Sequence, residues 1–138
     1  MKRLIIFLLV AFSISCSKDP ESFIEHINGY WEINSVITAD ETERNYSFNE
    51  TIDFFSINDS LKGFRKKLKP NIEGKFTTSK DAEKLKLVIE NDSLNVYYAT
   101  PYDTWKETIL YADSMNLKVI NENKNVYLYK RYIPLNLE

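Results

Sequence analysis

The sequence predicts an all-β protein: an antiparallel up-and-down β-barrel of about eight strands, preceded by a short helix. After residue 29, apolar and polar residues alternate with a period of two in a series of short runs. Short connections rich in Asn, Asp and Ser separate the runs, as at 58–60, 91–93 and 112–114. Many short strands joined in this way indicate an antiparallel meander, and closing the meander into a barrel removes its exposed edges.

The first fifteen residues predict a signal peptide. Lys2 and Arg3 precede an apolar run over 4–12, which is shorter than the ~20 residues that span a bilayer as a helix. The segment Ser13-Ile14-Ser15-Cys16 follows and resembles the lipidation site of bacterial lipoproteins. Cys16 is the only cysteine of the chain, so it has no intramolecular disulfide partner. We expect a signal peptide over 1–15, a lipid-anchored tether over 16–22 and a barrel domain over 23–138.

Composition limits the classes of function. The net charge is −2, and it becomes −4 when Lys2 and Arg3 leave with the leader, which argues against nucleic acid as a partner. One histidine and one cysteine give no set of residues for a zinc site or a nucleophile, and three glycines give no phosphate-binding loop. We therefore expect no metal, no cofactor and no enzyme activity.

The helix is predicted over 20–28. Asp19 is a suitable N-cap, Pro20 suits the first helical position, and Gly29 ends the helix. Phe23, Ile24 and Ile27 fall on one face at helical spacing.

Five runs in the first half follow. Residues 30–37 form a first strand with Trp31 and Ile33 on one face, and 39–49 form a polar loop or short strand. Residues 51–57 are rich in β-formers, 61–68 form a basic strand that ends near Pro70, and 72–78 form a further strand.

The second half has the clearest alternation. Its predicted strands are residues 84–89, 94–99, 105–111, 115–120 and 126–132.

Three features together resemble the lipocalin-like (calycin-type) lipoproteins found in Bacteroidetes. They are the short helix that runs into Gly29-Tyr30-Trp31, the late hairpin around residues 113–119, and the last strand 126–131 with its terminal basic residue. The resemblance implies an outer-membrane lipoprotein, on the periplasmic face or the cell surface. It also implies a barrel-closing structural pair, in which Arg131 stacks on Trp31 as a cation–π contact.

Aromatic residues concentrate in the hairpin of residues 94–111. Tyr98, Trp105, Glu107 and Tyr111 are the candidate residues lining a ligand site, because an eight-stranded barrel can hold one small ligand. The same aromatic residues are also ordinary strand formers and core residues. Glu107 alternates with Trp105, and a carboxylate inside a barrel would need a partner.

A basic run occupies one strand and its end, at Lys62, Arg65, Lys66, Lys67 and Lys69. It suits lipid head groups, anionic glycans or an acidic partner, and it equally suits a solvated strand edge that resists aggregation.

Two functions are compatible with these features. The first is a membrane-anchored lipocalin-like lipoprotein that binds a small apolar or amphipathic ligand in the cell envelope. The second is a non-enzymatic accessory lipoprotein with a filled barrel, whose outer face contacts an envelope protein.

Overall fold

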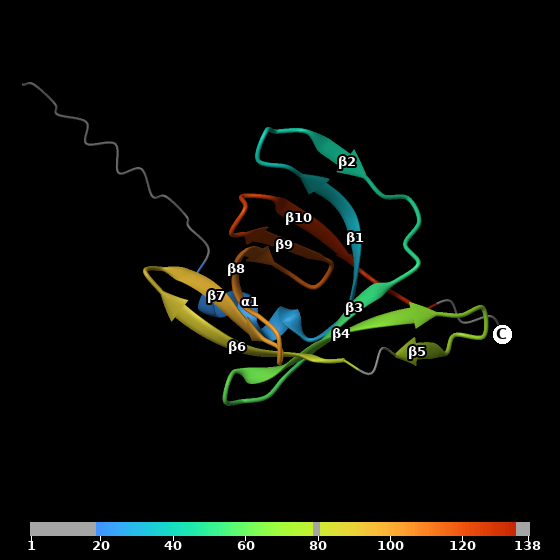
Figure 1. The fold of residues 1–138 in the computed structure, drawn as a ribbon, viewed down its shortest axis with the longest axis horizontal. Coiled ribbons are helices and arrows are strands. Elements are labelled where there is room, and N and C mark those ends of the chain that lie inside the picture. The colour runs from blue at the N-terminus through green and yellow to red at the C-terminus, as the bar shows by residue number, and fades with distance from the viewer. Residues whose placement is uncertain (1–18, 79–80, 135–138) are drawn as a thin grey trace, which may run out of the picture.

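The computed structural model describes residues 19–78 and 81–134 (Figure 1). The predicted signal peptide over 1–15 and Cys16 lie outside these residues. The elements, in chain order, are α1 (Glu21–Ile27), β1 (Gly29–Ile37), β2 (Glu43–Asn45), β3 (Ile52–Ile57), β4 (Lys62–Pro70), β5 (Phe76–Thr78), β6 (Glu83–Glu90), β7 (Ser93–Ala99), β8 (Thr104–Ala112), β9 (Asn116–Asn121) and β10 (Val126–Arg131).

Eight of the described strands form a closed antiparallel barrel, which confirms the predicted fold class. The strands pair around the ring in the order β1, β3, β4, β6, β7, β8, β9 and β10. Strand β10 then pairs with β1, from Trp31↔Arg131 to Ile37↔Val126, and this pairing closes the ring. Figure 1 looks down the barrel, with the eight strands arranged around its axis.

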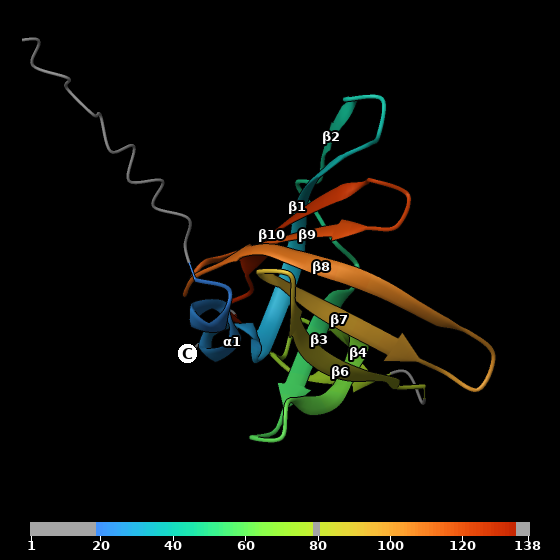
Figure 2. The same cartoon turned by 90° about the vertical axis from the view of Figure 1, so that its left-hand side faces the viewer.

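Helix α1 covers one end of the barrel (Figure 2). Phe23 and Ile27 are buried, and Phe23 contacts Tyr111 of β8 edge-to-face at 5.8 Å between ring centroids. Apolar side chains of β1, β3 and β6–β10 join them in one core; its largest members exposed by less than 2% are Trp31, Ile27, Leu87, Leu94, Leu117 and Val96. Burying such side chains stabilises the fold by about 1.5–3 kcal/mol each.

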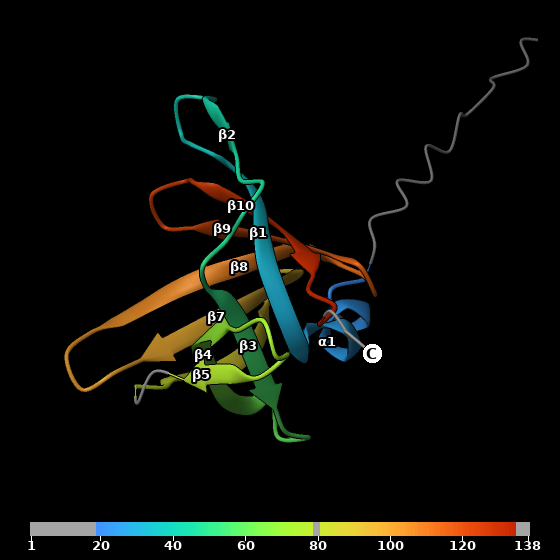
Figure 3. The ribbon, with the colours of Figure 1, turned by 90° about the vertical axis from the view of Figure 1, so that its right-hand side faces the viewer.

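Strands β2 and β5 lie outside the ring of eight (Figure 3). Strand β2 is short and exposed, and it pairs with β1 as a hairpin within the polar segment over 39–49. The predicted strand over 72–78 is longer than the observed one: β4 continues to Pro70, a turn follows, and β5 begins at Phe76. Asn71 makes this turn, because its side-chain oxygen accepts hydrogen bonds from the N–H groups of Glu73 and Lys75.

The alternation of β1 is interrupted by a register shift between Ile33 and Ser35. Such a bulge reverses the faces that follow it, so Val36 is buried, whereas strict alternation predicts that it lies on the face opposite Trp31. No helix within residues 19–78 and 81–134 is long and apolar enough to cross a membrane.

Candidate functional site

The interior of the barrel changes from apolar to charged between its two ends. The end covered by α1 is packed with aliphatic and aromatic side chains. Toward the other end, which we call the open end, Asp53 of β3 and Arg65 of β4 are buried, with exposed fractions of 3% and 8%. Buried charges are expensive unless they are paired, so their partners define the site.

Arg65 is the centre of this charged group. Its Nε donates to Oε2 of Glu83 at 2.5 Å, and its Nη1 lies 3.5 Å from Oε2 of Glu107. Its Cζ lies 4.3 Å from the ring centroid of Tyr98 and 5.9 Å from that of Phe55. One guanidinium on β4 therefore contacts side chains from four other strands, β3, β6, β7 and β8, by ionic and cation–π contacts.

A second ion pair lies beside the first. Nζ of Lys67 donates to Oδ1 of Asp53 at 2.6 Å, and these two residues are register partners on β4 and β3. The Lys67 side chain is half exposed while Asp53 is buried, so the lysine extends from the buried carboxylate toward solvent.

The environment shifts the pKa values of the buried groups. Burial raises the pKa of the Glu107 carboxyl, and the charge of Arg65 only partly offsets this. Burial also raises the pKa of the Tyr98 hydroxyl well above its usual value. For Arg65, burial alone would lower the pKa, but the negative groups around it reverse this and hold it charged.

A cavity of about 880 Å³ opens against this group. Arg65, Lys67 and Glu83 line it from the barrel side, and the β7–β8 loop lines it through Thr100, Pro101 and Tyr102. Tyr102 is 96% exposed, so the loop presents an aromatic ring at the entrance. The volume is typical of sites for small molecules.

The structure brings three of the four candidate lining residues together. Tyr98 and Trp105 are register partners whose rings stack at 5.1 Å between centroids, and Glu107 follows on the same face of β8 as Trp105. Tyr111 lies elsewhere: it packs on Phe23 of α1 at the covered end.

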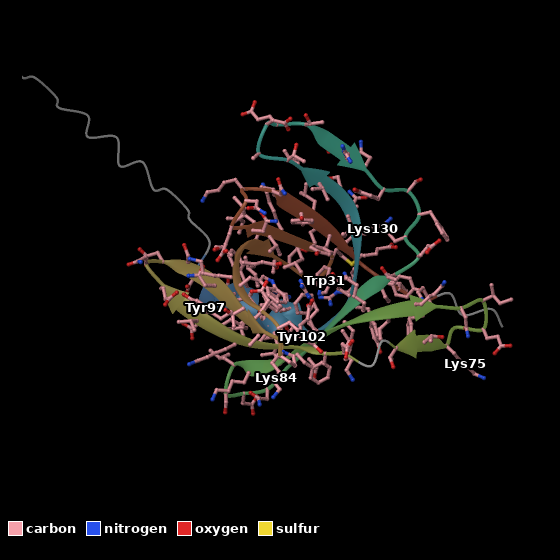
Figure 4. All side chains as sticks on the ribbon, viewed as in Figure 1. Trp31, Lys75, Lys84, Tyr97, Tyr102 and Lys130 are labelled. Atoms are coloured by element: carbon pink, nitrogen blue, oxygen red, sulfur yellow. The ribbon has the colours of Figure 1, made fainter. Side chains whose placement is uncertain are left out.

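Arg131 and Trp31 meet at the covered end. Cζ of Arg131 lies 3.7 Å from the Trp31 ring centroid, and the two residues are register partners. The guanidinium also donates to the carbonyl oxygens of His26, Asn28 and Ser114. It thus satisfies carbonyl groups at the end of α1 and in the β8–β9 turn. Figure 4 shows Trp31 inside the ring of strands.

Sequence reasoning missed Arg65, Glu83, Asp53 and Lys67 as members of one site. Arg65 was visible only as part of a basic run, although it occupies an alternate position between Gly63 and Lys67. Arg65 and Lys67 alternate along one face of their strand, and they pair with Phe55 and Asp53 of the preceding strand. This pattern of charges on an inward face is the signal that could have indicated the site. Within the described ranges, no three His, Cys, Asp or Glu side chains are grouped to hold a metal ion.

Comparison with known proteins agrees with this architecture. The family model of the lipocalin-like domain matches residues 27–127, so the chain belongs to the lipocalin-like domain family. A crystal structure of a lipocalin-like protein from Bacteroides uniformis ATCC 8492 has a TM-score of 0.51 at 11% identity, covering 78% of this chain and 99% of that chain. This likeness shows the fold alone. A search of curated proteins finds no match.

Proposed function

We propose that this protein is a binding protein of the cell envelope that holds a small amphipathic ligand at the open end of its barrel. One observation carries the proposal: the cavity of about 880 Å³ ends on the buried Arg65 and on Glu83. A cavity with charged groups at its base and an aromatic ring at its entrance suits a molecule with one polar end and one apolar end.

The charged base favours an amphipathic ligand over a purely apolar one. Arg65 and Lys67 already have carboxylate partners, so a hydrocarbon placed on them would remove those pairs from water with no new hydrogen bond. A ligand with a polar head group can exchange hydrogen bonds with these residues. Its apolar part would then contact Pro101 and Tyr102 at the entrance.

The predicted signal peptide and Cys16 support a location at a membrane. With Cys16 carrying a diacylglycerol thioether, at least two acyl chains would anchor the protein, whereas one chain alone holds only marginally. The short tether over 16–22 would keep the barrel close to the bilayer, and we propose the outer membrane as its location, by resemblance to lipocalin-like lipoproteins.

A fluorescent fatty acid tests the ligand proposal. The protein expressed without residues 1–16 is titrated with 11-(dansylamino)undecanoic acid, and we expect saturable binding. Glu83→Gln removes one charge beside Arg65 and should change the dissociation constant by at least about threefold. Glu73→Gln makes the same charge change in the exposed β4–β5 turn and should leave the constant unaltered. Absence of saturable binding, or equal effects of the two variants, would contradict the proposal.

A labelling experiment tests the anchor separately. Cells that express the full chain are grown with labelled palmitate, and the label should enter the protein. Cys16→Ser should abolish the label, whereas Ser17→Ala should leave it. Label retained by the Cys16→Ser variant would exclude lipidation at this residue.

The alternative, an accessory lipoprotein with a filled barrel, has one observation in its favour: the half of the barrel next to α1 is packed with apolar side chains. In that case the protein would bind no amphiphile, and the outer face would contact an envelope protein. The titration above distinguishes the two functions.

A further inference from the structure

The outer face of the barrel carries a second cavity, of about 1030 Å³, over strands β4, β6, β7 and β8. Five charged residues line it, and four of them are lysines: Lys62, Lys84, Lys86 and Lys106, with Glu122 as the one carboxylate. The groove adjoins the cavity at the open end, because Lys84 and Ala99 line both, and Leu85 and Tyr98 also border it. Its four lysines lie at register positions on the strand face opposite Arg65.

The register places the groove residues in two rows that run straight across four strands. The first row is Lys62, Lys86, Tyr97 and Lys106, and the second is Phe64, Lys84, Ala99 and Thr104. Neighbouring strands lie about 4.8 Å apart, so each row is about 14 Å long. The small side chain of Ala99 leaves space between Lys84 and Thr104. In Figure 4, Lys84 and Tyr97 lie away from Trp31 at the centre of the barrel.

The lysines of the groove make no close ion pair, although, besides the hydrogen bond from Tyr97, the charge of Lys106 helps to lower the pKa of the Glu90 carboxyl. None of the four lies within 4.0 Å of a carboxylate among residues 19–78 and 81–134. Lys62 and Lys86 are direct cross-strand partners, and like charges in this position destabilise a sheet. Four ammonium groups therefore line one groove without a close ion pair and can meet anions there, in a chain whose net charge is −2.

An aromatic ring in fixed position lies among these charges. The Tyr97 side chain is 38% exposed, and its hydroxyl donates to Oε2 of Glu90 at 2.5 Å. Asn95 donates to the same oxygen at 2.8 Å and holds the carboxylate in place. A ring fixed in this way offers a flat apolar face to a ligand without loss of side-chain freedom on binding.

From these contacts we infer that the groove binds an acidic oligosaccharide. A linear chain of sugar acids carries anionic groups at regular intervals along a row of cations about 14 Å long. Its ring faces pack on Tyr97 and Phe64, and its hydroxyl groups have Asn58 and Thr104 as hydrogen-bond partners. A concave surface that combines cations, one fixed ring and side-chain hydrogen-bonding groups suits such a chain better than a flat membrane surface.

Calorimetry with defined oligomers tests the inference. The purified protein is titrated with the hexamer of galacturonic acid, and with maltohexaose as the neutral oligomer of equal length. We expect binding of the acidic hexamer that weakens with added salt, and none of the neutral one. The double variant Lys84→Gln/Lys86→Gln should weaken binding about five- to tenfold. Lys69→Gln/Lys75→Gln makes the same charge change at the β4–β5 hairpin and should have no effect.

Two further arms separate the glycan from other anions. Backbone NMR shifts on adding the acidic hexamer should concentrate at residues 62, 84, 86, 97 and 106, on the outer face. A hexaglutamate peptide and vesicles containing phosphatidylglycerol should bind at least about tenfold more weakly than the hexamer. Equal binding of the peptide or the vesicles, shifts confined to the barrel interior, or equal losses in the two double variants would overturn the inference.

Discussion

Arg65 of β4 and Glu107 of β8 approach each other inside the barrel, with Nη1 of the guanidinium 3.5 Å from Oε2 of the carboxylate. The two strands are not neighbours, because β6 and β7 lie between them in the ring. The pair therefore joins two sides of the barrel where the apolar core ends, and its arginine also lines the cavity that we assign to the ligand.

Replacing one member of the buried pair should cost more stability than replacing both. We expect Arg65→Met to lower the free energy of unfolding by about 3–5 kcal/mol, because Glu83 and Glu107 lose their cation. Arg65→Met/Glu107→Leu should recover part of this loss. Urea unfolding measures both, with Lys66→Met, on the outer face, as the control. A cost below about 1 kcal/mol for Arg65→Met would show that the pair is not buried as described.

Glu107 should make folding stability depend on pH. Its pKa is raised in the folded protein, mainly by burial, above the usual value of 4.5. The folded state then holds this proton more tightly than the unfolded state, so its contribution is full below pH 4.5 and is lost as pH rises through the raised pKa. We expect Glu107→Gln to remove this fall from the stability curve above pH 4.5. An unchanged curve would contradict the assignment.

Asp113 should behave in the opposite way. Hydrogen bonds from the Tyr111 hydroxyl and from the N–H groups of Met115 and Asn116 lower the pKa of this carboxyl to about 2. Its contribution to stability is present above pH 3.8 and is lost as pH falls toward 2. Carbon-13 NMR titration should show Asp113 ionised at pH 3. Tyr111→Phe should raise its pKa, whereas Tyr46→Phe, in an exposed loop, should not. No rise in the Tyr111→Phe variant would exclude the hydroxyl as the main cause.

Arg131 should be irreplaceable by lysine. The guanidinium lies over Trp31 and donates to three carbonyl groups, and one ammonium group cannot reproduce this fork. We expect Arg131→Lys to lower the free energy of unfolding by about 1–3 kcal/mol, measured in urea. Arg44→Lys, on the exposed strand β2, should cost nothing measurable. Equal urea unfolding midpoints for the two variants would contradict a structural role of the Arg131–Trp31 pair.

The backbone conformation and the surroundings of Gly29 explain why a glycine stands two residues before Trp31. Its φ is +116°, and a Cβ added there would lie 2.7 Å from Nη1 of Arg131. The sequence predicted only that this glycine ends the helix. Its close approach to Arg131, 102 positions further along the chain, arises from the closure of the barrel and could not be predicted from local sequence.

Local patterns were enough to predict the barrel, because alternation and turn residues are short-range signals. They failed where a local irregularity intervenes, as at the bulge near Ile33 and at the turn around Asn71. They also failed at the site, since the contact of Arg65 with Glu107 depends on which strands face each other across the barrel. Alternation correctly placed Glu107 on the same face as Trp105, but a period of two does not identify a partner on another strand.

Native mass spectrometry of the protein expressed without residues 1–16 tests the central claim most directly. We expect the gently ionised protein to carry a bound amphiphile of a few hundred daltons, which organic extraction releases. Blocking the cavity with Thr100→Trp should reduce the bound fraction, whereas Thr77→Trp, on β5 outside the barrel, should leave it unchanged. A protein of bare mass that also takes up no added fatty acid would contradict a ligand-binding barrel.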